Sequence, residues 1–216
     1  MRAILFDFDG VIALSEDLYW KSANSLLEPR GVRVPREEWF ARFPGTGVRH
    51  IFSSLLREHG LGGPHDVPAW IARWKAAYQA LIRAEGVKPV PGLHAFLKLL
   101  DARGIPRAIC TGTPRANVLL QLEILGLSFP LVAAEDYVHH KPHPEGYLKA
   151  AALLKQAPQD CVVFEDAPPG LQAAKAAGMR CVAFLTTVPR ARLEREKPDL
   201  LVKDFTELNL DKVLAL

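Results

Sequence analysis

The chain has 216 residues, of which 49% are hydrophobic and 24% charged, and its formal net charge is +3. This length and balance are typical of a globular protein with one sizeable core, or with a core and a small second domain. They exclude a collagen-like chain and a charge-rich disordered one, and no apolar run approaches the roughly 20 residues of a membrane-spanning helix.

The three cysteines, Cys110, Cys161 and Cys181, each lie in or beside an apolar run, and no metal-ligand spacing links them. We therefore expect buried, reduced thiols in a cytoplasmic protein without a secretory signal. Basic side chains are scattered, and between Arg190 and Lys197 they alternate with glutamates. The sequence therefore predicts no nucleic-acid partner and no membrane partner, and it gives no indication of oligomeric state.

The first predicted strand, residues 3–6, is followed by two carboxylates and a glycine, Asp7, Asp9 and Gly10. Side chains two positions apart in a strand point the same way, so Asp7 and Asp9 are expected on one side. Two like charges at the end of an apolar strand cost free energy unless a cation or a proton compensates them. A hard divalent cation would do so, whereas a solvated acidic turn is the structural alternative.

After Gly10 the pattern changes from strand to helix, and no strand-like run appears before residue 86. Ser15 is placed to cap the first of these helices. The expected helices are 16–27, 36–42, 48–59 and 67–84, separated by turns rich in glycine and proline. We predict an all-helical domain over residues 15–87, inserted into a core domain made of residues 1–14 and 88–216.

From residue 90 onward, short apolar strands alternate with helices. The expected strands are 108–110, 131–133, 161–164, 181–184 and 200–202. The expected helices are 91–103, 114–125, 144–154, 170–177 and 208–214. This alternation predicts an α/β fold with a doubly wound parallel sheet that has helices on both faces.

Polar side chains stand directly after several of these strands. In open parallel sheets, ligands bind outside the carboxyl ends of the strands. Carboxylates there can bind a divalent cation, while threonine, lysine and backbone N–H groups can hold a phosphoryl group. Each of these side chains, taken alone, also has a structural explanation. Thr111 could cap a helix, and Lys141 could be a surface lysine. Glu165 and Asp166 could be acidic residues in the first turn of a helix. Their occurrence together at one end of one sheet favours a site.

Four short segments carry these side chains in chain order: Asp7-Phe8-Asp9-Gly10-Val11, Thr111-Gly112-Thr113, Lys141-Pro142-His143-Pro144 and Glu165-Asp166-Ala167-Pro168-Pro169-Gly170. They resemble, in the same order, the four motifs of the haloacid dehalogenase (HAD) superfamily. The resemblance covers nearly the whole chain, and the helical insert is similar to a type I cap. It implies a Rossmann-like HAD core of the phosphoglycolate-phosphatase-like and β-phosphoglucomutase-like branch.

The resemblance implies a role for each acidic residue of these segments. Asp7 would be the nucleophile that forms an aspartyl-phosphate, and Asp9 would be the general acid and base. Mg²⁺ would be held by the Asp7 carboxylate, the Asp9 backbone carbonyl and Asp166. Glu165 would lie close to the ion or act through water.

The transferring phosphoryl group would be held by Thr111, the Gly112 amide and Lys141. Three histidines flank Lys141 and could suggest a separate metal cluster. Because hard carboxylate ligands are already available, we interpret these histidines as loop residues. They are His139, His140 and His143.

Substrate specificity is expected to come from side chains of the helical insert, which would close over the site and exclude water. The candidates are Ser15, Tyr19, Thr46, Arg49 and Lys75. Arg49 and Lys75 can equally be solvated helix charges.

Two departures from the family pattern bear on the reaction. Leu14-Ser15 stands where many members have an Asp-Ser pair, and Tyr19 stands where β-phosphoglucomutase-like enzymes carry a cap histidine. We therefore expect a Mg²⁺-dependent phosphatase, a phosphoric monoester hydrolase acting on a small phosphorylated metabolite such as a sugar phosphate or a phosphoglycolate-like acid. The alternatives are a phosphomutase, a dehalogenase, which the metal-binding carboxylates Asp9 and Asp166 disfavour, and a non-catalytic phospho-acceptor module.

Overall fold

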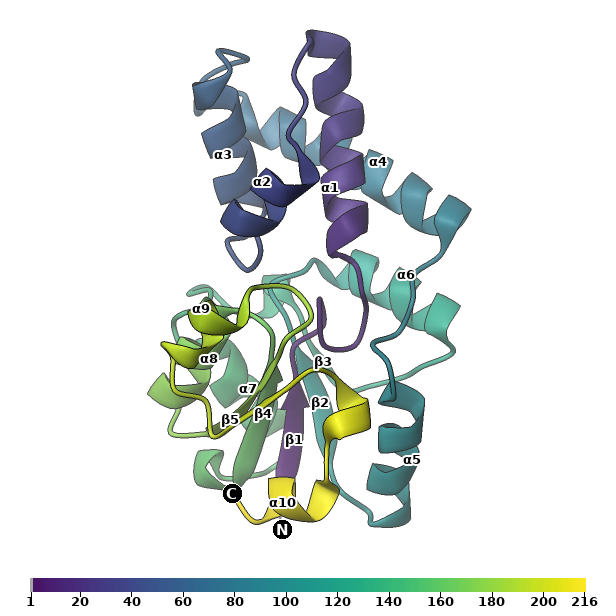
Figure 1. Ribbon diagram of the computed structural model, residues 1–216, viewed down its shortest axis with the longest axis vertical. Helices are drawn as coiled ribbons and strands as arrows, with labels where there is room; N and C mark the ends of the chain where they lie inside the picture. Colours follow the sequence, from purple (N-terminus) through teal and green to yellow (C-terminus); the bar gives the residue numbers. More distant parts are fainter. Residues whose placement is uncertain (1) are drawn as a thin grey trace. The chain divides into compact units, whose positions relative to one another are not determined.

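The computed structural model describes residues 2–216, and its contacts divide the chain into two compact units (Figure 1). One unit consists of the chain up to Leu14 together with Lys88–Leu216, and the other is Ser15–Val87. Among the described residues, no helix combines the length and the apolar character needed to cross a membrane.

The first unit is built on a six-stranded, entirely parallel sheet with the strand order β3-β2-β1-β4-β5-β6. This confirms the predicted doubly wound α/β fold. Phe6 at the end of β1 pairs with Ile109 on one side and Phe164 on the other, so these strands end at the same edge of the sheet. The strands are β1 (Ala3–Phe6), β2 (Arg107–Cys110), β3 (Leu131–Val132), β4 (Cys161–Glu165), β5 (Arg180–Phe184) and β6 (Leu200–Val202).

Successive side chains of the central strands point to opposite faces of the sheet, so they contribute to two separate hydrophobic cores, one on each face. Odd-numbered residues of β1, β4 and β5, such as Leu5 and Val163, pack with Ala108 and Cys110 of β2 in one hydrophobic cluster that includes residues of α7 (Glu145–Leu153) and α8 (Pro168–Ala176). The small side chains of this cluster, many of them alanines, let both helices approach the sheet closely.

Even-numbered residues form an aromatic core on the opposite face. The ring centroid of Phe164 lies 5.3 Å from that of Phe6 and 5.4 Å from that of Phe184. Phe96 of α5 (Leu93–Ala102) and Phe205 complete this layer, with ring centroids 5.2 Å apart. Such edge-on and tilted ring pairs add to the stabilisation from apolar burial.

The remaining elements of this unit are one longer helix, two five-residue helices and three 3-10 turns. They are α6 (Arg115–Leu125), α9 (Arg190–Glu194), α10 (Leu210–Leu214) and the 3-10 turns η2 (Ala134–Asp136), η3 (Pro158–Asp160) and η4 (Phe205–Glu207). Most expected boundaries agree with the structure to within a turn. Helix α9 was not predicted, because a five-residue helix rich in arginine carries no apolar period.

The second unit contains four helices and the 3-10 turn η1 (Glu28–Arg30). The rings of Tyr19, Trp74 and Tyr78 form its aromatic centre, with centroids 4.6 to 5.1 Å apart. The Asn24 side chain accepts a hydrogen bond from the Val34 N–H at 2.8 Å and donates one to the Val34 carbonyl at 3.1 Å, which fixes the loop after the first helix. The helices are α1 (Glu16–Leu27), α2 (Arg36–Arg42), α3 (Val48–Glu58) and α4 (Val67–Glu85).

The two chain segments that lead to the helical unit run side by side in the first unit. Ala13 and Pro89 form an antiparallel bridge, and the Leu14 N–H donates to the Lys88 carbonyl at 2.9 Å. The helical unit is therefore an insertion whose two ends meet.

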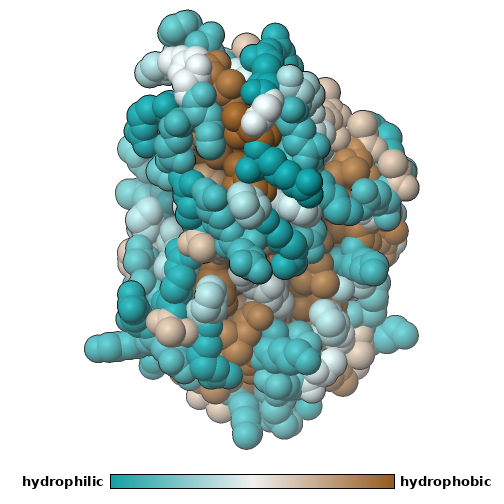
Figure 2. Space-filling model, turned by 45° about the horizontal axis from the view of Figure 1, so that its top comes forward, coloured by the Kyte–Doolittle hydropathy of each residue, from teal (hydrophilic) through white to brown (hydrophobic). Residues whose placement is uncertain are grey.

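The surface is ordinary for a globular protein. Hydrophilic side chains cover most of the face shown in Figure 2, and hydrophobic ones show between them. The exposed large hydrophobic side chains come from several different elements, as isolated surface residues commonly do. Among the described residues they are Leu14, Leu99, Leu119, Ile124, Val138, Leu148 and Leu153.

The aromatic core yields a stability prediction. Phe164 is fully buried at the centre of its layer, so Phe164→Ala should lower the free energy of unfolding by about 3–5 kcal/mol through lost burial and an unfilled cavity. Leu119→Ala, at a side chain that is 51% exposed, should change it by less than about 0.5 kcal/mol. Urea denaturation of both variants measures the difference, and equal losses would contradict the assignment of this core.

Candidate functional site

Asp7 follows directly after β1 and lies on the same side as Leu5, the side covered by α7. The residue is only 9% exposed. Burial raises the pKa of its carboxyl to about 7, and the nearby charges of Glu165 and Asp9 act in the same direction against the opposing charge of Lys141. The site therefore disfavours an ionised Asp7 unless further positive charge is supplied.

Glu165 ends β4 on the same side of the sheet as Asp7, because β1 and β4 pair in register. One of its oxygens, Oε2, accepts the backbone N–H groups of Asp166 at 2.9 Å and Ala167 at 3.1 Å. Gly170 in α8 leaves the space that the carboxylate occupies, since a Cβ at that position would lie 1.6 Å from Glu165 Oε1. The missing side chain at Gly170 therefore lets α8 pack closely against the Glu165 carboxylate.

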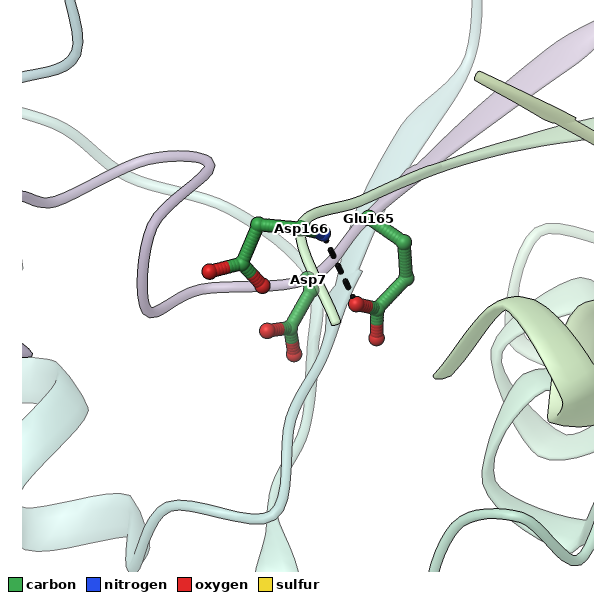
Figure 3. Close-up of side chains that lie close together, drawn as sticks. All are labelled: Asp7, Glu165 and Asp166. Atoms are coloured by element: carbon green, nitrogen blue, oxygen red, sulfur yellow. Dashed lines mark hydrogen bonds between the residues drawn. The ribbon is translucent and has the colours of Figure 1, made fainter. Parts of the chain in front are cut away.

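Carboxylate oxygens of Asp7, Glu165 and Asp166 lie within 4.8 Å of one another. Figure 3 shows the three side chains converging from the ends of two neighbouring strands. Within residues 2–216, no other group of three or more acidic, histidine or cysteine side chains comes together in this way. The donor set consists of hard oxygen atoms, which fits a divalent cation such as magnesium or calcium and does not fit a soft metal.

Gly10 also makes room for this cluster. Its φ angle is +74°, and a Cβ there would lie 1.9 Å from Asp166 Oδ2. A glycine is therefore required both by the left-handed backbone and by the acidic side chain beside it.

The Lys141 side chain is only 14% exposed, although it stands in a loop before α7. Its Nζ donates to Asp7 Oδ1 at 2.7 Å, to Glu165 Oε1 at 2.6 Å and to the Cys110 carbonyl at 3.3 Å. Burial alone would lower the pKa of the ammonium group, but the charges of Asp7 and Glu165 outweigh burial and hold the pKa well above its usual value. Lys141 therefore stays charged and partly neutralises the acidic cluster.

The segment after β2 presents hydroxyl groups to the same edge of the sheet. Thr111 is 1% exposed, and its Oγ1 accepts the N–H of Thr113 at 3.0 Å. It does not cap a helix, because Pro114 occupies the N-cap position of α6. Gly112 between the threonines is exposed, so its backbone is open to a ligand.

Asp9 lies outside the group of three carboxylates. Strand β1 ends at Phe6, so strict alternation does not extend to Asp9. Its Oδ2 accepts a hydrogen bond from Thr113 Oγ1 at 2.5 Å. Asp9 is nevertheless near Asp7, since its charge contributes to the raised pKa of Asp7.

The five predicted specificity residues all belong to the helical unit. Ser15 is buried and occupies the N-cap position of α1, but its side chain makes no capping hydrogen bond. The Tyr19 ring packs against Trp74. The Thr46 hydroxyl donates a hydrogen bond to the Phe43 carbonyl at 2.7 Å. Arg49 is exposed and Lys75 is partly exposed. Their part in specificity stays a prediction.

Sequence reasoning missed two side chains that contact the site. Thr113 donates to Asp9, and Tyr147 donates to Glu165. Thr113 could have been found from its place two residues after Thr111 in a strand-end motif. Tyr147 could not, because an aromatic residue in an apolar helix face is ordinarily a core residue.

The arrangement has a defined chemical capacity. A carboxylate is poised as a nucleophile beside a second carboxylate that can move protons. A lysine, a threonine hydroxyl and an open backbone segment can hold an oxyanion, and an acidic cluster can hold a divalent cation.

Known proteins resemble this chain in sequence and in fold. Residues 4–184 match the family described as haloacid dehalogenase-like hydrolase. A crystal structure of CbbY from Rhodobacter sphaeroides in complex with phosphate superposes with a TM-score of 0.84 at 26% identity, over 99% of each chain.

Curated relatives cover the chain along nearly its whole length. It is 33% identical to validoxylamine A 7'-phosphate phosphatase of Streptomyces hygroscopicus subsp. limoneus, over 96% of this chain and 95% of that protein. It is 30% identical to hexitol phosphatase A of Escherichia coli (strain K12), over 98% and 94%. Protein SUPPRESSOR OF QUENCHING 1, chloroplastic, from Arabidopsis thaliana is 31% identical over all of this chain, which spans 21% of that longer protein.

The contact between Gly170 and Glu165 yields a test of the acidic cluster. Gly170→Ala places a methyl group on the Glu165 carboxylate and should displace it from Lys141, weakening phosphate binding by about tenfold or more. The control is Gly178→Ala, where nothing lies within 4 Å of the added methyl and only the φ of +74° is strained. Calorimetric titration compares the two, and equal binding by both variants would contradict the inferred packing.

The raised pKa of Asp7 predicts a pH-dependent effect in cation-free protein. Below about pH 3 the carboxyl is protonated in the folded and unfolded states, so Asp7→Asn should change Tm little. Because the folded pKa is about 7 against the ordinary 3.8, the unfolded chain loses a proton between these values that the folded chain keeps. Wild-type stability should therefore fall relative to the variant over that range and level off above it.

Thermal melts in EDTA across this pH range measure the difference in Tm. A divalent cation should reverse it by stabilising the ionised wild type. A difference that stays flat, or that shrinks as the pH rises, would contradict the unfavourable burial of the Asp7 charge.

Proposed function

The chain belongs to the haloacid dehalogenase-like hydrolase family and is a phosphoric monoester hydrolase, and from this premise we propose that it is a Mg²⁺-dependent phosphatase. It hydrolyses a small phosphorylated metabolite, a sugar phosphate or a phosphoglycolate-like acid, through an aspartyl-phosphate on Asp7. The observation that carries the proposal is the Lys141 ammonium group, which donates to both Asp7 and Glu165 beside Asp166. This arrangement supports a nucleophile, a phosphate-binding cation and a metal-binding cluster in one place.

The substrate class is supported by the named relatives. Two of them are phosphatases, one of validoxylamine A 7'-phosphate and one of hexitol phosphates. Both match this chain across its helical and its core residues, and the CbbY structure was determined with phosphate. A polyhydroxylated phosphate ester of small size is therefore favoured.

In the first step, a carboxylate oxygen of Asp7 attacks phosphorus and the bond from phosphorus to the ester oxygen breaks. Asp9 donates a proton to the departing alkoxide, so the alcohol leaves in neutral form. In the second step, Asp9 takes a proton from a water molecule that attacks the aspartyl-phosphate. Inorganic phosphate is released and Asp7 is regenerated.

The transferring group carries negative charge, which Lys141, Thr111 and the Gly112 amide are placed to stabilise. Lys141 is held in position by two carboxylates before substrate arrives, so little reorganisation is needed when a phosphoryl oxygen replaces one of them. Thr111 is held by the N–H of Thr113 and can donate its own hydroxyl proton to an oxyanion.

Mg²⁺ would be held by the Asp7 and Asp166 carboxylates and the Asp9 backbone carbonyl, with Glu165 close by or acting through water. The buried carboxylates within 4.8 Å of one another fit such an ion. The ion would supply positive charge that offsets repulsion between Asp7 and the phosphate ester.

The helical unit is proposed to select the substrate through Ser15, Tyr19, Thr46, Arg49 and Lys75. Tyr19 packs into an aromatic cluster where β-phosphoglucomutase-like enzymes carry a histidine, which favours a phosphatase over a phosphomutase. The free, buried cysteines support a cytoplasmic location.

Release of inorganic phosphate from a panel of phosphorylated metabolites tests the proposal. The wild type should turn over in Mg²⁺ and stop in chelator. Asp7→Asn should reduce turnover by roughly a thousandfold or more, because the nucleophile is lost. Asp9→Asn should reduce it by about a hundredfold or more while still binding Mg²⁺.

Asp211→Asn is the matched control, since its side chain is 74% exposed in the C-terminal helix, and it should retain full activity. Turnover that persists in chelator or in Asp7→Asn would overturn the mechanism. Activity that depends on a sugar bisphosphate and interconverts phosphosugars without net phosphate release would establish the phosphomutase alternative.

A further inference from the structure

We propose that Tyr147 is a positioning residue that holds Glu165 against Lys141, so that Glu165 anchors the phosphate-binding lysine and does not ligate the metal ion directly. The inference rests on the proposed function, because it assigns Lys141 to the phosphoryl group. It gives a task to a buried tyrosine that the reaction steps leave unused.

Tyr147 is in the first turn of α7 and is 1% exposed. Its hydroxyl donates to Glu165 Oε1 at 2.9 Å, and the Lys141 Nζ lies 4.7 Å from the centre of its ring. The side chain therefore touches both members of the ion pair, one through a hydrogen bond and the other through its aromatic face.

The hydroxyl acts as a donor only. Burial, followed by the charge of Glu165, raises the pKa of Tyr147 well above its usual value, so the phenol keeps its proton at any working pH. A buried carboxylate oxygen is the acceptor it requires.

The hydrogen bonds of Glu165 leave no vacant position on its carboxylate. Oε1 accepts from Lys141 at 2.6 Å and from Tyr147 at 2.9 Å, and Oε2 accepts from the N–H groups of Asp166 and Ala167. A carboxylate has about four lone-pair positions. Direct coordination of a cation would have to displace one of these donors, so Glu165 is better placed to hold Lys141 than to bind metal.

The neighbouring backbone keeps Tyr147 in this position. Gly146 precedes it, and a Cβ there would lie 2.9 Å from Cys110 Sγ, so the start of α7 packs directly on β2. On the other side of the carboxylate, Gly170 brings α8 against Glu165 Oε1. Neither helix can shift without disturbing the ion pair.

Loss of the Tyr147 hydroxyl therefore has a specific consequence. Glu165 Oε1 would keep Lys141 as its one remaining donor, and the carboxylate could rotate toward the cation. Lys141 would lose its fixed position, and the phosphoryl group would be held less well.

Tyr147→Phe tests this, because it keeps the ring and removes only the hydroxyl. Calorimetry measures Kd for Mg²⁺ alone and for inorganic phosphate in saturating Mg²⁺, and steady-state kinetics give kcat and KM. We expect phosphate binding and kcat to fall by about three- to tenfold, the usual effect of one lost intramolecular hydrogen bond. The Kd for Mg²⁺ should stay within about twofold of wild type, because in this proposal neither Tyr147 nor Glu165 supplies an oxygen ligand to the ion.

Tyr78→Phe is the matched control, since Tyr78 is also fully buried but lies in the helical unit. It should leave phosphate and Mg²⁺ binding unchanged, and thermal melts confirm that both variants are folded. A second variant, Glu165→Gln, removes the charge that holds Lys141 and should weaken phosphate binding more than Mg²⁺ binding.

Three results would overturn the inference. The first is unchanged phosphate binding in Tyr147→Phe, and the second is a loss of Mg²⁺ binding in Tyr147→Phe as large as its loss of phosphate binding. The third is a Glu165→Gln variant whose Mg²⁺ binding is weakened more than its phosphate binding. The binding measurements need no turnover. Absence of any phosphatase activity in the wild type would therefore refute the proposed function, while the titrations would still decide the role of Tyr147.

Discussion

The site depends on an imbalance of charge in a buried place. One ammonium group, that of Lys141, lies among the carboxylates of Asp7, Glu165 and Asp166. Burial, followed by the charges of Glu165 and Asp9, raises the pKa of Asp7 to about 7 although Lys141 opposes the shift. The fold tolerates this imbalance because the rest of the sheet is apolar and well packed, so a locally unfavourable arrangement can be kept ready for ligands that supply the missing charge.

Packing around the carboxylates explains the small residues that accompany them. Gly10 and Gly170 lie where side chains would occupy the space of Asp166 and Glu165. The glycines therefore serve the acidic residues directly. The same close approach brings α7 and its Tyr147 onto the carboxylate edge of the sheet, so helix packing and site geometry cannot be separated.

Much of this could be predicted from the sequence, and what could not has identifiable causes. Alternation of short apolar strands with helices predicted the parallel sheet, because that pattern is a local property of the chain. The strand ends predicted which side chains would share one edge, and Asp7, Lys141 and Glu165 do come together. Helix α9 was missed because it is too short to show a period.

Contacts between side chains that are distant in the sequence could not be predicted from local sequence patterns. Thr113 meets Asp9, and Tyr147 meets Glu165, only because loops and helices from separate parts of the chain pack together. The expectation that Asp7 and Asp9 lie on one side rested on strand alternation, and it stays a prediction because β1 ends at Phe6, before both residues. Side-chain partnership depends on where an element ends, which the hydrophobic pattern does not specify.

The paired segments at Leu14 and Lys88 have a consequence for how this chain can change over time. The two ends of the helical insertion meet through a backbone hydrogen bond, and the insertion has an aromatic core of its own. For the folding of the sheet, the whole helical unit acts as one loop whose ends are held together. The entropic cost of closing a loop grows only slowly with its length. Helices could thus be lengthened, exchanged or redesigned in this unit with little penalty to the folding of the parallel sheet and the packed layers on its two faces.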